Sequence, residues 1–132
     1  MAYYDIFNIE KQITAYLLLL KISPNLKGFI FLKEGTRLLL NNGALKYNVN
    51  NSFYRELSSY CRETEDLVDR AMRHAIDVSV KRNGVKEFER RLCLNFSCGR
   101  PSPKEIICTI AERVELDTGQ DFKAKTILFK TF

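Results

Sequence analysis

The sequence predicts a compact all-α domain of about six helices. Its 132 residues are enough for a single domain with a real core. A composition of 45% hydrophobic and 28% charged residues is that of an ordinary globular protein. Apolar residues recur at helical spacing in successive segments, and glycine, proline and asparagine separate these segments.

The first predicted helices follow from start and stop signals. We expect a first helix that begins at the cap Asn8 and runs to about Leu20. Ser23-Pro24 is a start signal for a second helix, which runs to about Asn41, where Gly43 can take the left-handed position that follows a helix. Gly35 lies inside this second helix, and we expect it to mark a close contact.

A helix-turn-helix is predicted over about residues 50–82. A polar loop, 48–52, precedes a short helix over about 53–61. Arg62-Glu63 then forms a tight connection, and Thr64 caps a central helix that runs to about Arg82. A short helix, a turn and a longer helix are the organisation of this DNA-binding motif, although the glycine often found in the turn is missing.

The central helix has two chemically different faces. One face carries small and apolar side chains, which predicts contact with the core: Val68, Ala71, Met72, Ala75 and Ser79. The opposite face is charged and has one histidine and one lysine on its flank: Asp66, Asp69, Arg70, Arg73, Asp77, His74 and Lys81. Such a face either meets a partner or is solvated and paired within the helix, as Asp69 with Arg73.

The remaining chain is predicted to form two helices and an extension. Asn83-Gly84 stops the central helix, and a short helix follows over about 85–92. Ser102 caps a last helix over about 103–116, which completes a domain of residues 1–116. Residues 117–132 are β-branched and aromatic, which is compatible with an edge strand, packing on the domain or a poorly ordered tail.

Composition limits the class of function. The net charge of +5 suits a polyanionic partner but does not establish one. The 4 cysteines form no CxxC pair and are expected to be reduced cytosolic thiols without a metal or other cofactor. No nucleophile–base pair or phosphate-cradling loop predicts an enzyme or a small-molecule substrate, and the longest apolar run is too short to cross a membrane.

Several segments resemble a known family. Val68 to Val78 reads VDRAMRHAIDV, which resembles the recognition helix V-E-R-A-I-R-H-A-I-E-V of the stage-zero sporulation protein A C-terminal domain. Asn25 to Phe29 resembles the family's H-I-K-G-Y, and Arg82 to Gly84 resembles the turn after its recognition helix. Pro101 to Leu116 resembles its final helix, so the likeness extends in order over most of the chain.

The resemblance implies a cytoplasmic transcription regulator that binds double-stranded DNA, with domains pairing on adjacent sites as a homodimer or in tandem. Arg70 and Arg73 would reach bases in the major groove, and Asp69 stands where the family has a glutamate near a base edge. The other candidate DNA-contacting residues lie in the turn, at the start of the helix, or closer to the DNA backbone than to the bases: Arg62, Thr64, Asp66, His74 and Lys81.

Some features depart from the family pattern. Asp66-Leu67 replaces a Ser-Arg pair, and acids near the helix N-terminus oppose phosphate binding. The family protein also carries an N-terminal phosphoreceiver domain, so we expect regulation by aspartyl phosphorylation to lie outside this chain. These departures leave an alternative hypothesis, a protein-interaction module that kept the fold, lost DNA readout and modulates a related regulator. An exposed Leu67 in an apolar patch would favour that alternative.

Overall fold

The computed structural model describes residues 3–42, 51–96 and 99–118, with only the backbone described for residues 3–7 and 51. Within these ranges the chain forms helices and no strand, which confirms the predicted all-α class. The 6 helices are α1 (Tyr3–Leu19), α2 (Lys27–Asn41), α3 (Asn51–Cys61), α4 (Glu65–Lys81), α5 (Gly84–Leu92) and α6 (Pro103–Thr118).

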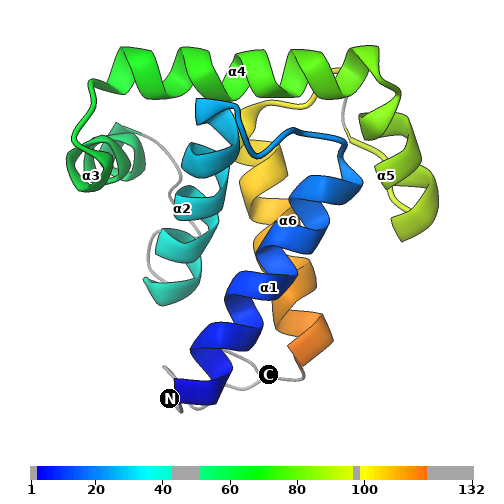
Figure 1. Ribbon diagram of the computed structural model, residues 1–132, viewed down its shortest axis with the longest axis horizontal. Helices are drawn as coiled ribbons and strands as arrows, with labels where there is room; N and C mark the ends of the chain where they lie inside the picture. Colours follow the sequence, from blue (N-terminus) through cyan, green and yellow to red (C-terminus); the bar gives the residue numbers. More distant parts are fainter. Residues whose placement is uncertain (1–2, 43–50, 97–98, 119–132) are drawn as a thin grey trace.

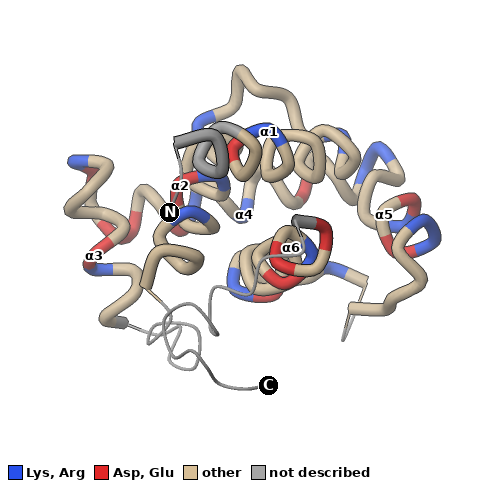
Figure 2. The backbone as a smooth tube through the Cα atoms, turned by 90° about the horizontal axis from the view of Figure 1, so that it is seen from below, with Lys and Arg blue, Asp and Glu red and all other residues tan. Residues whose placement is uncertain are grey.

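In the fold, α4 lies across one end of a small helical bundle. Figure 1 shows α1, α2 and α6 running away from α4, with α3 and α5 at its two ends. Seen from below in Figure 2, α3 and α5 lie on opposite sides of the bundle. The beginning of α1 and the end of α6 both lie at the end of the bundle far from α4 (Figure 1). One long side of α4 therefore has no helix of the bundle over it.

The inner face of α4 is in the core, as the helical periodicity predicts. Val68, Met72, Ala75 and Ser79 are buried, and Ala71 is half-buried. They pack with buried apolar side chains of the other helices, among them Leu20, Phe29, Leu32, Phe53, Phe88, Ile107 and Ile110. Because one side of α4 is fixed in this core, the opposite side is fixed in orientation toward solvent.

Three glycines and one buried hydroxyl set how closely the helices approach. A Cβ on Gly28 of α2 would lie 2.3 Å from the backbone oxygen of Ala71 in α4. A Cβ on Gly84 would lie 1.9 Å from the backbone oxygen of Leu20, to which the buried hydroxyl of Ser79 donates a hydrogen bond of 2.5 Å. The close contact predicted for Gly35 is confirmed, since a Cβ there would lie 2.9 Å from the Ile107 side chain.

Two predicted caps and one predicted helix stop are confirmed by side-chain or backbone geometry. The Thr64 side chain accepts a hydrogen bond from the Leu67 amide at 3.1 Å. Ser102 and Glu105 form a reciprocal capping box, with bonds of 3.1 and 3.2 Å between each side chain and the other's amide. Asn83 adopts a left-handed conformation between α4 and α5.

Two predicted helix starts are wrong. Because α1 begins at Tyr3, Asn8 lies inside the helix rather than at its cap; no glycine or proline in this stretch stops the helix from extending upstream. The second helix begins at Lys27, three residues past Pro24, and its cap residue Leu26 makes no side-chain cap bond. The Ser23 hydroxyl accepts instead from the Asn25 amide at 3.2 Å, which closes a turn before the helix.

Other predicted boundaries shift slightly or cannot be compared. The predicted loop 48–52 overlaps the start of α3, which begins at Asn51. Asp117 and Thr118, predicted as the start of the extension, continue α6, and residues 119–132 lie outside the described part of the chain. Gly43 also lies outside it, although the predicted end of the second helix at Asn41 is confirmed.

The close approach at Gly28 makes a stability prediction. In Gly28→Ala, the new methyl meets the backbone of α4, and this overpacking outweighs the better helix propensity of alanine. We expect the free energy of unfolding to fall by about 1–3 kcal/mol, measured by urea denaturation followed by circular dichroism. Gly99→Ala is the matched control, because nothing lies within 4 Å of a Cβ at that exposed position. A Gly28→Ala protein as stable as the parent would contradict the contact.

Candidate nucleic-acid interface

The turn between α3 and α4 is built by a left-handed arginine. Arg62 has φ 61°, the conformation that glycine usually supplies at the end of a helix. The Glu63 amide donates to the Ser58 carbonyl at 3.0 Å and the Arg62 amide to the Ser59 carbonyl at 3.2 Å. These two bonds form a Schellman motif, so the turn forms without the missing glycine. The exposed Arg62 side chain lies at the junction of the two helices.

The start of α4 is stabilised by its own acidic residues. Thr64 caps the helix, and Glu65 and Asp66 occupy its first turn. Negative charge at this end interacts favourably with the helix dipole, by typically about 0.3–1 kcal/mol for an exposed group. The acids that depart from the expected DNA-binding pattern therefore have a local structural role.

The outward face of α4 presents two arginines, each paired with an acid one turn earlier. Arg70 Nε lies 3.1 Å from an oxygen of Asp66, and the two side chains are 71% and 79% exposed. Arg73 Nε lies 2.9 Å from an oxygen of Asp69, with side-chain exposures of 58% and 34%. The predicted pairing of Asp69 with Arg73 is confirmed, and Asp66 makes a second pair of the same geometry.

These pairs are too weak to lock the arginines in place. Exposed ion pairs on one helix stabilise by about 0.3–0.5 kcal/mol. A guanidinium has five N–H donors, and the pairs that Arg70 and Arg73 make engage the donor on Nε. The hydrogen bond that Arg73 donates to Asp69 raises the pKa of Arg73, so its guanidinium stays charged. Both side chains retain donors for a ligand placed above α4.

The other predicted site residues of α4 are placed along the same helix. His74 and Lys81 are exposed, and Lys81 lies in the last turn. Asp77, on the charged face, is held by Arg100 at 2.9 Å. Arg100 comes from the loop before α6, and no local sequence signal connects it to α4.

Leu67 does not form the exposed apolar patch that would favour a protein-interaction module. Its side chain is partly buried and packs against the core. The large exposed apolar residues found in the described part of the chain lie on other helices: Leu18, Ile30, Tyr60 and Leu116. The outward face of α4 is therefore polar along its length.

Several of the remaining charged residues and cysteines of the described chain have structural roles. Lys33 and Arg37 both pair with Glu10 of α1, at 3.8 and 3.1 Å. Burial raises the pKa of the Cys61 thiol, which lowers its reactivity. Among the described residues no group of three or more His, Cys, Asp or Glu side chains could hold a metal ion, and Cys98 lies outside them. No helix found there is long and apolar enough to cross a membrane.

A short helix and a tight turn that lead to a long helix with an exposed, arginine-bearing face are the organisation of a helix-turn-helix DNA-binding domain. Residues 13–114 match the family model described as "Sporulation initiation factor Spo0A C terminal". The chain belongs to this family, which is the DNA-binding effector domain of a sporulation regulator. The match begins within α1 and ends within α6, and it confirms the resemblance found in the sequence.

The cap at Thr64 makes a second stability prediction. Thr64→Ala removes the acceptor for the Leu67 amide and leaves an unsatisfied donor at the start of α4. We expect a loss of about 1 kcal/mol in the free energy of unfolding. Thr64→Ser keeps the hydroxyl and serves as the matched control in the same urea titration. Equal midpoints for the alanine and serine proteins would show that the cap contributes nothing.

Proposed function

We propose that this protein is a sequence-specific DNA-binding transcription regulator that places α4 in the major groove of duplex DNA. The observation that carries the proposal is the exposed Arg70 and Arg73 pair on the outward face of a helix whose inner face is fixed in the core. Membership of a DNA-binding family supports the class of partner. A duplex DNA partner would also place the protein in the cytoplasm.

The dimensions of α4 suit the major groove. An α-helix with its side chains is about 10–12 Å across, and the groove is about 12 Å wide. Arg70 and Arg73 are three residues apart, which separates them by roughly 4.5 Å along the helix axis. Stacked bases are about 3.4 Å apart, so the two side chains reach neighbouring base pairs. A guanidinium donates two bonds to O6 and N7 of guanine, which supplies about 1–3 kcal/mol of discrimination.

The other site residues take roles that follow from their positions and donor or acceptor groups. Asp69 accepts a bond from the amino group of cytosine, beside the guanine contacts of its arginine neighbour. Arg62 and Thr64 lie at the turn before α4, where a phosphate of one strand passes. His74 and Lys81 contact the DNA backbone further along, and Asp66 pairs weakly with Arg70 until the arginine engages a base.

The acids of α4 set the balance between specific and general binding. Each of the two arginines is paired with an aspartate, so the base-reading patch as a whole carries no net charge. Such a patch attracts DNA phosphates weakly, because general affinity comes from uncompensated cations. Binding through this patch depends on finding the right bases.

Adjacent domains on DNA are the second part of the proposal. We expect domains to occupy neighbouring short sites as a pair, in contact through α6 and nearby surface, where Leu116 is 67% exposed. Gel-shift titration with one or two copies of the site tests this arrangement. Two copies that bind domains independently would exclude pairing.

Removal of either arginine tests the base-reading role. For Arg70→Ala and Arg73→Ala we expect affinity for the preferred site to fall by roughly 5- to 150-fold, equivalent to about 1–3 kcal/mol, and affinity for random duplex to fall much less. The preferred site comes from selection in a random duplex pool, and fluorescence anisotropy measures binding.

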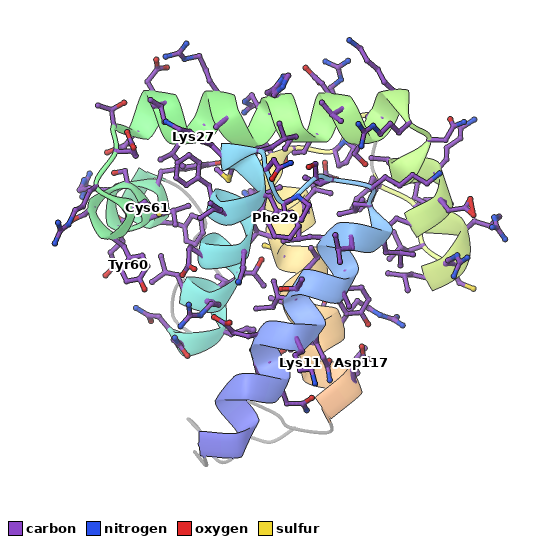
Figure 3. The ribbon with its side chains drawn as sticks, viewed as in Figure 1. Lys11, Lys27, Phe29, Tyr60, Cys61 and Asp117 are labelled. Atoms are coloured by element: carbon purple, nitrogen blue, oxygen red, sulfur yellow. The ribbon has the colours of Figure 1, made fainter. Side chains whose placement is uncertain are left out.

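The control for this experiment is a cation far from α4. Lys11 is exposed on α1, and Figure 3 places it toward the end of the bundle opposite α4. Lys11→Ala is expected to bind both duplexes like the parent. Selection that enriches no sequence, or arginine variants that keep the parent's preference, would exclude base reading by α4.

A further inference from the structure

Four exposed cations from three segments come together at the C-terminal end of α4. Lys21 lies in the turn after α1, Lys81 and Arg82 lie at the end of α4, and Lys86 lies in the first turn of α5. Figure 1 shows the connection from α1 to α2 reaching this end of α4, where α5 begins. We refer to the four side chains as the basic cluster.

Backbone contacts hold Lys21 and Arg82 of the basic cluster close together. Lys21 has φ 61°, and its ammonium donates to the Arg82 carbonyl at 3.3 Å. Arg82 Nη1 lies 3.5 Å from the Lys21 carbonyl, at the limit of a hydrogen bond. The neighbouring Ser79–Leu20 bond and the close approach of Gly84 fix this turn against the end of α4. The packed fold therefore holds Lys21 beside Arg82, and Lys81 and Lys86 flank Arg82 along the chain.

The basic cluster differs from the base-reading patch in its charge balance. The salt bridges found in the described part of the chain include no member of the cluster, whereas Arg70 and Arg73 each have an aspartate partner. Glu87 is an acid that interacts with the cluster. Its pKa is lowered chiefly by Arg90 and also by Lys21. Glu87 is itself engaged by Arg90, at 2.6 Å. An ammonium has three donors and a guanidinium five, so the cluster has donors left for an anion.

If Arg70 and Arg73 lie in the major groove, the length of α4 places the basic cluster outside that groove. At 1.5 Å per residue, the 17 residues of α4 span roughly 25 Å, about twice the width of the major groove. Lys81 lies eleven residues after Arg70, roughly 16 Å further along the axis and within about 20° of the same side. The C-terminal end of α4 thus extends past the edge of the groove, where a phosphate backbone passes.

We propose that the basic cluster binds the phosphates of one DNA strand beside the groove, with Lys21, Arg82 and Lys86 acting together with Lys81. The inference rests on the proposed insertion of α4 in duplex DNA and adds Lys21 and Lys86, which lie outside the helix-turn-helix of about residues 50–82. Phosphate contacts are independent of sequence, so the cluster supplies general affinity and α4's arginines supply discrimination.

The test is the salt dependence of binding. Each phosphate contact contributes about −0.9 to the slope of log affinity against log salt. We expect Lys86→Gln and Arg82→Gln each to reduce the slope by about 0.9, which makes the loss of affinity between about 50 and 200 mM salt roughly 3.5-fold smaller. Affinity at low salt falls by the same factor on the selected site and on random duplex, because the contact does not read bases.

Matched variants separate this effect from a change in folding or in overall charge. Lys86→Arg keeps the cation and is expected to restore the parent's slope. Lys11→Gln removes the same charge in the middle of α1, away from α4, and is expected to leave the slope unchanged. Loss of a cation in the first turn of α5 also favours that helix, so Lys86→Gln remains folded, which circular dichroism verifies.

The outcomes distinguish this inference from the proposed function. If the parent binds a selected duplex and the cluster variants keep its salt slope, the phosphate role of the cluster is wrong and base reading by α4 stands. If Lys11→Gln changes the slope as much as Lys86→Gln, the effect is one of net charge, and the cluster again has no special role. If the parent binds no duplex at any salt concentration, both proposals fail together.

Discussion

The structure depends on close backbone contacts at the middle and at the C-terminal end of α4's inner face. Near the middle, Gly28 lets α2 approach until a Cβ would lie 2.3 Å from the Ala71 carbonyl oxygen. At the C-terminal end, Gly84 and Ser79 meet the Leu20 carbonyl in the turn after α1. Because interiors are close-packed and resist deformation, contacts of this kind fix the position of α4 with little dependence on its outer side chains. The outward face is then free to carry chemistry without a cost to the fold, which is what a reading helix requires.

The same constraint explains how charge is divided along α4. The N-terminal part carries arginines compensated by Asp66 and Asp69, and these acids also favour the helix dipole. The C-terminal part carries Lys81 and leads into Arg82, to whose carbonyl Lys21 donates; the Leu20 contact brings Lys21 there from another segment. Intrahelical pairing and DNA reading were competing interpretations of Arg70 and Arg73 in the sequence. The structure shows the pairing, and the pairs are weak enough to be compatible with the proposed reading.

Features that depend on neighbours in sequence could be predicted, and those that depend on tertiary contacts could not. The Thr64 and Ser102 caps, the close contact at Gly35 and the buried face of α4 follow from local chemistry and helical periodicity. Asn8 and Ser23 carry equally good cap signals, yet α1 extends past the first and a turn uses the second. The contacts of Lys21 with Arg82 and of Arg100 with Asp77 join residues far apart in sequence, so no local sequence pattern predicts them. The outward orientation of the candidate site was therefore predictable, whereas its basic flank was not.

The division of charge along α4 gives the departures from the family pattern a physical meaning. On a random sequence, an arginine that leaves its aspartate loses a weak pair and gains no bidentate contact, while the carboxylate remains near the phosphates. On a guanine in the right place, the same arginine gains about 1–3 kcal/mol. Under the proposed function, Asp66 and Asp69 would lower affinity for every site, and only a correctly placed guanine would offset that loss, so that specificity arises from a difference of affinities. General affinity would then have to come from cations outside the reading patch, as we propose for the basic cluster at the end of α4.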